Sequence, residues 1–360
     1  MKNHWSRMVC LAMLIMVGVG ESRAESEVPA LAVPPSHLDR FLEQCAGRGL
    51  QAQEAQTMTV RGLDGWLFLG SELRHVGCGK FWGEDAKAAS QSTRPENADP
   101  VPAIVDFNDQ LKAEGIRLIL MPVPPKVVVY PDKLMEEMDG AGPRVDIFHQ
   151  AFYRQLQEAG VEVLDVTDRF RTERGVEGDP LYCRQDTHWS GRGCEVAAQE
   201  LLGRIGRPDW LKDCATSGYE KSVRTLEMSG DLWQALEDPS IAKETLSLHH
   251  VVDAAGEPME PAEDSPVILM GDSHCLVFHA GDDMHARGAG LADQLAYGLG
   301  CPIELLGTRG SGSTAVRVDL FRRWKRSPDY YEGKKIVVWC LTARDFSESI
   351  SGWKVVPIKK

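Results

Sequence analysis

One stretch of the sequence, residues 267–274, constrains the fold more than any other. It starts with four apolar residues, which predict a buried strand, and ends in Gly271-Asp272-Ser273-His274. We expect a short helix over residues 275–279, so that Ser273 lies where a strand ends and a helix begins. In open α/β sheets this edge is where sites are built, which makes Ser273 a candidate functional residue.

Strand and helix patterns alternate on both sides of this stretch. This rhythm predicts a parallel sheet with helices on both faces, an α/β fold of the flavodoxin-like, three-layer α/β/α kind. The further strands are expected at residues 116–121, 161–166, 303–306 and 336–341. The helices are expected around residues 104–111, 145–156, 194–205, 291–299 and 315–324.

The same patterns suggest how the chain is organised. Residues 1–24 are expected to be a signal peptide, and residues 25–100 an N-terminal extension with a hairpin that turns at Asp64-Gly65. Residues 101–350 are expected to form the main domain. Residues 206–266 are polar and interrupted, which indicates an insertion with a few short strands, notably over 245–252.

The first residues have the layout of an export signal. Lys2 and Arg7 precede an apolar stretch over residues 8–20, and Ser22-Arg23-Ala24 offers a small-x-small cleavage site. The apolar stretch is short for a membrane span. We therefore expect export with cleavage after Ala24 and a periplasmic location, with an uncleaved N-terminal anchor as the alternative.

Charge and cysteine content narrow the function classes. The net charge of −13, without a basic run, argues against a nucleic-acid partner. One of the nine cysteines lies in the expected signal, and no Cys-x-x-Cys motif occurs. The other eight permit disulfides after export but do not reveal which cysteines pair. They are Cys45, Cys78, Cys183, Cys194, Cys214, Cys275, Cys301 and Cys340.

A second motif, Asp186-Thr187-His188-Trp189, offers the base that Ser273 would need to act as a nucleophile. A serine hydroxyl needs an adjacent base and a third group that orients that base. Because Asp186 and His188 are two positions apart in a turn, the Asp186 carboxylate is expected to reach Nδ1–H of His188 and leave Nε2 facing Ser273. Ser190 is the expected cap of the following helix. The two motifs together predict a Ser-His-Asp triad that needs neither metal nor cofactor.

The triad would also need groups that stabilise an oxyanion and bind the substrate. The backbone N–H of Ser273 is one expected donor, and the loop Gly310-Ser311-Gly312 is the expected source of a second, because glycine permits close backbone approach. The loop from Lys126 to Tyr130, Arg309 and Arg344 follow predicted strands. We expect these residues to position the substrate.

Several motifs together resemble one family, the alginate O-acetyltransferase group of SGNH-hydrolase-like proteins (the AlgJ/AlgX type). The resemblance covers roughly residues 60–346 and includes the family's permuted order, with Asp-x-His before the serine motif. Its motifs are Asp64–Phe68, Pro124–Lys126 with Tyr130-Pro131, Asp186–Trp189 with Gly191, Gly230–Leu232, Gly271–Ser273 and Trp339 with Arg344.

This resemblance implies a periplasmic enzyme that moves acetyl groups onto hydroxyls of an exopolysaccharide. Ser273 would be the nucleophile, His188 the base and Asp186 its orienting group, and a membrane-bound O-acyltransferase would deliver the acetyl group. Two features depart from the family. No carbohydrate-binding module is expected after the main domain, and Thr342-Ala343-Arg344 stands where ordinary SGNH esterases carry Gly-x-Asn-Asp.

Three alternatives stay open at this point. One is a secreted carbohydrate esterase with the same triad. Another is a metal-dependent phosphoesterase with Asp186, His188, Asp272 and His274 as ligands, although its further ligand motifs are missing. The third is a polysaccharide-binding scaffold whose tryptophans stack on sugars. The tryptophans in question are Trp66, Trp82, Trp189 and Trp233, and the histidines read as structural or surface residues are His249, His250, His279 and His285.

Overall fold

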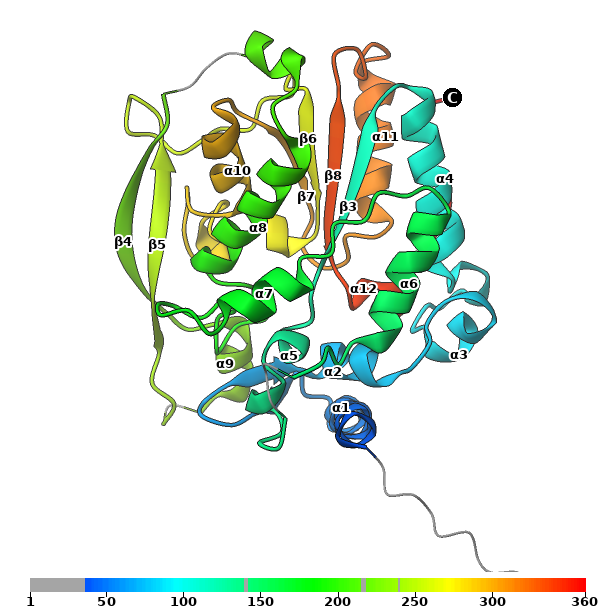
Figure 1. Ribbon diagram of the computed structural model, residues 1–360, viewed down its shortest axis with the longest axis vertical. Coiled ribbons are helices and arrows are strands. Elements are labelled where there is room, and N and C mark those ends of the chain that lie inside the picture. The colour runs from blue at the N-terminus through cyan, green and yellow to red at the C-terminus, as the bar shows by residue number, and fades with distance from the viewer. Residues whose placement is uncertain (1–35, 139–141, 215–217, 239) are drawn as a thin grey trace, which may run out of the picture. The chain divides into compact units, whose positions relative to one another are not determined.

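The computed structural model describes residues 36–138, 142–214, 218–238 and 240–360 (Figure 1). The expected signal peptide, residues 1–24, lies outside the described residues. Within the described ranges, no helix combines the length and the apolar character that a membrane crossing requires.

The centre of the fold is a four-stranded parallel sheet. Its strands are β3 (Arg117–Val123), β6 (Val267–Gly271), β7 (Glu304–Gly307) and β8 (Ile336–Thr342), in the spatial order β3-β8-β6-β7. A single parallel bridge, Leu120 to Val163, extends the sheet beyond β3. We number the strands from β6 as 1, through β7 and β8 as 2 and 3, to β3 and the bridge at Val163 as 4 and 5. In this numbering the spatial order across the sheet is 2-1-3-4-5. This is the flavodoxin-like order with a permuted starting point.

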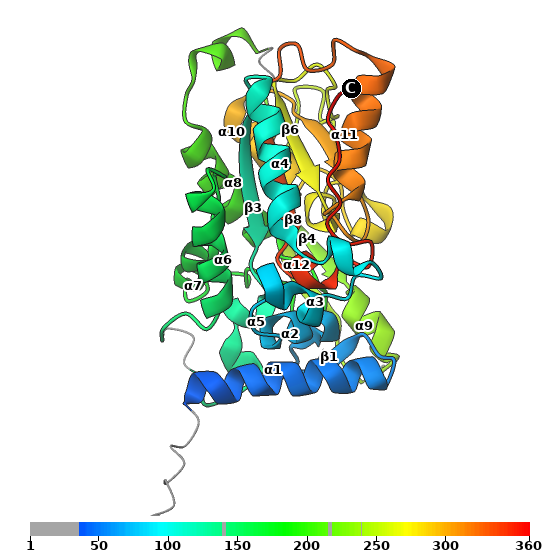
Figure 2. The same ribbon diagram turned by 90° about the vertical axis from the view of Figure 1, so that its right-hand side faces the viewer.

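Successive side chains of the strands face opposite sides of the sheet, and each side is buried by its own helices. Leu118, Leu120 and Trp339 pack among α4 (Pro100–Ala113), α6 (Ile147–Glu158) and α11 (Ala315–Arg326). Ile119, Leu269 and Val338 pack among α8 (Gly191–Ile205) and α10 (Leu291–Leu299). Figures 1 and 2 show these helices on the two sides of the sheet. The expected three-layer α/β/α sandwich is present.

The N-terminal part of the described chain lies at the carboxyl end of the strands. It consists of α1 (His37–Glu54), the hairpin strands β1 (Thr59–Arg61) and β2 (Leu67–Leu69), and α2 (Gly70–Gly77). Asp64 and Gly65 both have left-handed backbones, with φ of 51° and 76°, as the expected tight hairpin turn requires. In Figure 2, α1 lies across this end of the molecule.

The polar segment between α8 and β6 forms a two-stranded antiparallel sheet outside the central layers. Its strands are β4 (Glu220–Met228) and β5 (Glu244–Val252), with α9 (Asp231–Leu236) between them. Leu246 and Leu248 of β5 are buried and join the hydrophobic cluster of α8 and α10. The segment is therefore anchored to the core by one strand, while β4 is largely exposed.

The remaining helices are short. They are α3 (Ala86–Ala89), α5 (Lys126–Val129), α7 (Thr167–Glu173), α12 (Asp345–Glu348), and the 3-10 turns η1 (Gly83–Asp85), η2 (Pro95–Asn97), η3 (Pro131–Lys133), η4 (Asp209–Asp213), η5 (Ser273–Cys275) and η6 (Asp282–Met284).

Two sequence expectations differ from the structure. Residues 161–166 make only the bridge at Val163 rather than a full strand, because polar residues interrupt the buried ones and only β3 is there to pair with. The helix expected over 275–279 does not form: only Cys275 is helical, as the last residue of the 3-10 turn η5, and Phe278 has a left-handed φ of 58° that no helix continues through.

Candidate active site

Ser273 lies just beyond β6, in a turn that the surrounding backbone determines. A Cβ on Gly271 would lie 1.6 Å from the carbonyl oxygen of Cys340, so only glycine lets β6 approach β8 here. The fully buried Asp272 then fixes the turn. Its Oδ1 accepts the N–H of His274 at 2.8 Å, and its Oδ2 accepts the N–H of Thr342 at 2.6 Å.

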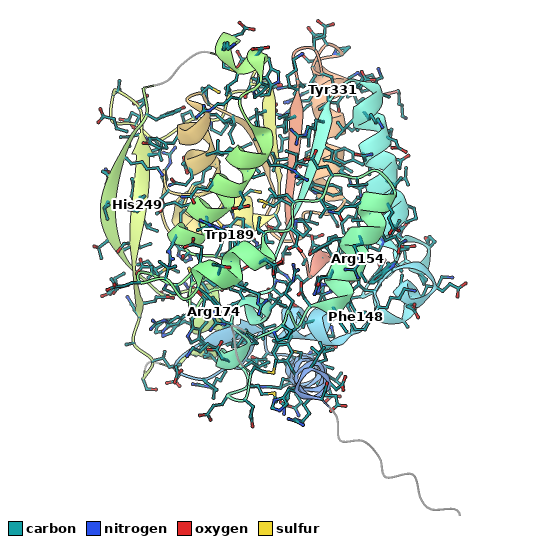
Figure 3. All side chains as sticks on the ribbon, viewed as in Figure 1. Phe148, Arg154, Arg174, Trp189, His249 and Tyr331 are labelled. Atoms are coloured by element: carbon teal, nitrogen blue, oxygen red, sulfur yellow. The ribbon has the colours of Figure 1, made fainter. Side chains whose placement is uncertain are left out.

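His188 reaches Ser273 from the loop that enters α8. Its Nε2 accepts a hydrogen bond from Ser273 Oγ at 2.7 Å. The adjacent Trp189, labelled in Figure 3, is fully buried and donates from Nε1 to the carbonyl oxygen of His274 at 3.1 Å. Ser190 caps α8 by accepting the N–H of Gly193 at 3.2 Å, as expected. The tryptophan thus joins the two loops that carry His188 and Ser273.

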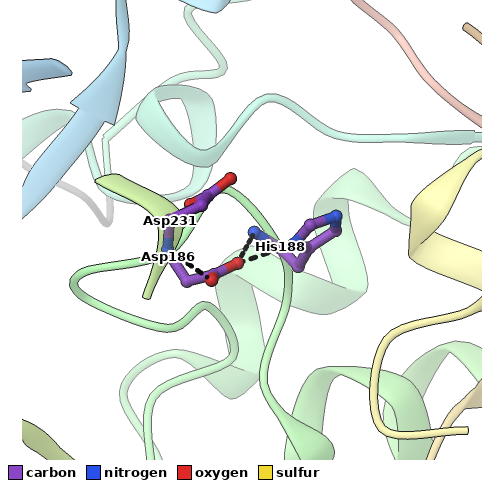
Figure 4. A group of neighbouring side chains, drawn as sticks. All are labelled: Asp186, His188 and Asp231. Carbon is purple, nitrogen blue, oxygen red and sulfur yellow. Dashed lines mark hydrogen bonds and ion pairs between the residues drawn. The ribbon is translucent and has the colours of Figure 1, made fainter. Parts of the chain in front are cut away.

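Asp186 orients His188 in the way its spacing predicts. Its Oδ1 accepts both the backbone N–H of His188 at 3.0 Å and Nδ1–H at 2.6 Å (Figure 4). The Nδ1 proton facing the carboxylate leaves Nε2 as the acceptor for Ser273. The structure therefore brings Ser273, His188 and Asp186 into one hydrogen-bonded series, and their exposed fractions are 7%, 6% and 1%.

The second oxygen of Asp186 is also fully engaged. Its Oδ2 accepts the backbone N–H of Asp231 at 2.9 Å and a hydrogen bond from His285 Nε2 at 2.9 Å. Asp231 in turn accepts from Thr187, at 2.8 Å from its N–H and 2.7 Å from its hydroxyl. The interpretation of His285 as a structural or surface residue was incomplete, because it contacts the candidate site directly.

Asp186, His188 and Asp231 lie close enough to be compared with a metal site (Figure 4). A carboxylate has about four acceptor positions. All four of Asp186 already receive N–H groups, and both nitrogens of His188 are engaged, with Asp186 and Ser273. This donor set fits a hydrogen-bonded catalytic group better than a set of metal ligands.

Burial and charge set the protonation of these groups. Burial raises the pKa of the Asp186 carboxyl, but the charges and hydrogen bonds of His188 and His285 outweigh it and hold that pKa well below its usual range. Burial lowers the pKa of His188, yet the charge of Asp186 and the hydrogen bond to it bring that pKa above its usual value. Near neutral pH, an ionised carboxylate thus supports a basic imidazole that faces a serine hydroxyl.

Lys126 and Tyr130 do not face the candidate site as the sequence suggested. Lys126 is 1% exposed, and its Nζ donates to the carbonyl oxygens of Leu67, Arg184 and Asp186 at 2.7, 3.2 and 2.9 Å. Tyr130 is buried against Trp66, with ring centroids 4.2 Å apart. Because the three protons of Lys126 are all used, its observed contacts support the Asp186 loop rather than a substrate.

The backbone N–H groups expected to stabilise the oxyanion differ in whether another group of the protein already accepts them. The N–H of Gly312 donates to Asp345 Oδ2 at 2.7 Å, so it does not point to Ser273, whereas Gly310 is exposed with φ of 92°. In the described part of the chain, the N–H of Ser273 itself has no hydrogen-bond partner. The N–H of Ser273 is therefore still available as an oxyanion donor, whereas that of Gly312 is already used.

The two arginines that were expected to position the substrate lie in different surroundings. Arg309 pairs with Asp283 at 2.6 Å on the exposed surface. Arg344 is half-buried, and its Nη1 donates to Thr342 Oγ1 at 3.1 Å. Thr342 is also the residue whose N–H holds Asp272. Arg344 therefore lies next to the turn that carries Ser273.

The tryptophans and cysteines were also candidates for a role. Trp66, Trp82 and Trp189 are buried, and the half-buried Trp233 donates from Nε1 to the carbonyl oxygen of Ile241 at 2.8 Å. Three of the four are therefore closed to stacking on a sugar. The eight cysteines of the described ranges all carry free thiols in the structure.

Known proteins resemble this chain in sequence. Two are named probable alginate O-acetylase AlgJ, from Pseudomonas syringae pv. tomato and Pseudomonas putida, and both are 27% identical. The first match covers 50% of this chain and 41% of the relative, and the second covers 61% and 56%. The chain thus spans about half the length of these curated relatives.

Solved structures show the same fold. The O-acetyltransferase domain of Pseudomonas putida AlgJ superimposes with a TM-score of 0.59 at 22% identity, over 81% of this chain and 92% of that one. Pseudomonas aeruginosa AlgX superimposes with a TM-score of 0.57 at 17% identity, over 84% and 67%. The family model described as SGNH hydrolase-like domain, acetyltransferase AlgX, matches residues 59–341. Since this match takes in most of the sequence, the chain belongs to the AlgX family of SGNH hydrolase-like domains.

Proposed function

We propose that this chain is an exported O-acetyltransferase that moves an acetyl group through Ser273 onto a hydroxyl of an exopolysaccharide. The observation that carries the proposal is the series Ser273 Oγ–His188 Nε2 at 2.7 Å and His188 Nδ1–Asp186 Oδ1 at 2.6 Å. It supplies a nucleophile, a base and an orienting carboxylate within hydrogen-bond distance of one another.

In the first half-reaction, His188 Nε2 takes the proton of Ser273 as Oγ attacks the carbonyl carbon of the acetyl donor. The developing oxyanion accepts the N–H of Ser273. When the tetrahedral intermediate collapses, the bond to the leaving group breaks and that group receives the proton from His188. Asp186 stays ionised and stabilises the imidazolium in between. The product is acetyl-Ser273.

In the second half-reaction a sugar hydroxyl attacks acetyl-Ser273. His188 removes the hydroxyl proton and returns it to Ser273 Oγ as the acetyl–serine bond breaks. Water competes for the same intermediate, so transfer requires that the acceptor is bound and oriented. Arg344, next to the Ser273 turn, is the proposed acceptor contact, with Arg309 further out on the surface.

The names of the relatives indicate the biological setting of this proposal. Proteins named probable alginate O-acetylase make an alginate-like polymer the first acceptor to test. A membrane-bound O-acyltransferase is the proposed partner that supplies acetyl groups. The leader-like pattern of residues 1–24 supports a periplasmic location.

Transfer and hydrolysis are separated by one experiment. The purified protein is incubated with a chromogenic acetyl ester, with and without a panel of acidic and neutral oligosaccharides, and acetylated sugar is measured by mass spectrometry. We expect acetylated oligosaccharide with the wild type and none with Ser273→Ala. If no oligosaccharide is acetylated while acetate is released at an unchanged rate, the chain is a carbohydrate esterase instead.

A further inference from the structure

A second histidine, His285, bonds to the Asp186 carboxylate at the oxygen that His188 does not use. Its Nε2–H donates to Oδ2 at 2.9 Å, whereas His188 Nδ1–H donates to Oδ1 at 2.6 Å. The side chain of His285 is 14% exposed, so this bond is largely shielded from water. Each oxygen of the carboxylate therefore faces one imidazole.

The backbone of His285 has a conformation that few residues adopt. Its φ is 72°, in the left-handed region that disfavours residues with a Cβ. The bonds from His285 N–H to the Asp282 carbonyl, at 3.1 Å, and from Gly281 N–H to the Ala286 carbonyl, at 2.9 Å, hold the loop in this form. Such strain persists where surrounding contacts fix it, and it is concentrated at functional sites.

We propose that His285 is a positioning residue for the acyl-transfer chemistry, which holds the Asp186 carboxylate in place and moderates its pull on His188. The proposal rests on the proposed function. A hydrogen bond to Oδ2 stabilises negative charge on that oxygen and leaves less on Oδ1. Without it, Oδ1 becomes a stronger acceptor for His188 Nδ1–H, and the carboxylate loses one of the contacts that fix its orientation.

Other charged and titratable groups face the same pair and stay in place when His285 is replaced. The carboxylates of Asp231 and Asp272 favour the imidazolium of His188, and the ring of His274 lies 4.9 Å from that of His188. Asp283 faces His285 from its own loop and pairs with Arg309. Removing His285 therefore takes away one contact of Asp186 and the neighbour that Asp283 faces, while Asp231, Asp272 and His274 keep their positions around His188.

The test compares four variants with the wild type. His285→Ala and the shorter His285→Asn remove the contact to Oδ2, while His285→Gln keeps an N–H donor of similar reach. His279→Ala is the matched control, because His279 is 11% exposed and bonds Asp293 at 3.0 Å, away from Ser273. The readouts are kcat and KM for an acetyl ester, and the titration of the His188 ring followed by NMR.

We expect His285→Ala and His285→Asn to lower kcat by roughly 10-fold or more with little change in KM, because the base is misplaced. The midpoint of the His188 titration should rise by about half a pH unit or more. His285→Gln should restore most of the wild-type kcat and most of the wild-type His188 midpoint, and His279→Ala should match the wild type in both quantities. A purely structural role would not be rescued by glutamine or move the His188 midpoint.

The NMR titration does not depend on turnover. The proposed function and the positioning role of His285 can therefore be refuted independently of each other. If the wild type forms no acetyl-Ser273, the proposed function is wrong, while the His188 midpoint still reports on His285. If His285→Ala and His285→Asn keep both the wild-type kcat and the wild-type midpoint, the positioning role is overturned. Equal losses in His285→Gln and His285→Ala would overturn it as well.

Discussion

Replacing Lys126 by methionine tests whether this lysine supports the Asp186 loop or contacts the substrate. Three donated hydrogen bonds need all three protons of the ammonium group, so Lys126 is charged where it is buried. The carboxyl of Glu72 is also buried and accepts the N–H of Lys126 at 2.8 Å; burial raises its pKa, and the charges of Arg344 and Lys126 oppose that rise. Methionine has a similar length but provides neither charge nor donors.

The size of the effect follows from these contacts. A hydrogen bond from a charged donor contributes about 1.5–3 kcal/mol. Removing one member of a buried charged group costs about 3–5 kcal/mol, because its partners are left without compensation. We therefore expect Lys126→Met to lower the free energy of unfolding by about 4 kcal/mol. In a chain of this size that corresponds to a melting temperature roughly 6 °C lower.

Thermal unfolding followed by circular dichroism measures this loss, with acetyl-ester turnover recorded below the transition. Lys133→Met is the matched control, because Lys133 pairs with the exposed Asp64 on the nearby hairpin and should leave the transition unchanged. We expect Lys126→Met to lower kcat, because the carbonyl of Asp186 loses its donor. An unchanged melting temperature with a raised KM and an unchanged kcat would refute this reasoning and restore the substrate contact.

Three further predictions concern the same region. Asp186→Asn should fold normally but lose about 10⁴-fold in kcat, because the amide no longer holds the catalytic tautomer of His188; wild-type turnover would contradict this. Gly230→Ala should lower kcat, because its Cβ would lie 2.5 Å from Asp186 Cβ, whereas Gly203→Ala, with nothing within 4 Å, should not. Burial raises the pKa of Asp345 from 3.8 to about 7. The unfolded chain therefore ionises this carboxyl more readily than the folded one, and the folded state loses stability as the pH rises between these two values. Asp345→Asn should therefore be more stable by up to roughly 4 kcal/mol at pH 8 and little different at pH 4.

The parts of the fold that could be predicted are those that depend on local sequence. Strands β3, β6 and β8 are buried on both faces and read as continuous apolar runs. The bond between Asp186 and His188 joins residues two positions apart, so their spacing alone predicted it. Both kinds of signal are contained within a few residues.

The parts that were missed depend on contacts between distant segments. His285 meets Asp186 across 99 positions, and the sequence around it carries no repeated or paired motif. Lys126 precedes three apolar residues and follows two prolines, a pattern equally consistent with an exposed loop. Only the carbonyl groups brought around it by β2 and the Asp186 loop make it a buried donor. Tertiary contacts likewise decided that residues 275–279 form no helix.

The central claim is that Ser273 carries the acetyl group, and one measurement tests it directly. The purified protein is mixed with an activated acetyl ester, quenched in acid within one turnover, and analysed by intact mass and by peptide mapping. The account predicts a mass increase of one acetyl group, located on Ser273 in the wild type and absent from Ser273→Ala. Acetyl-ester turnover that persists undiminished in Ser273→Ala, or a label on any other residue, would contradict it.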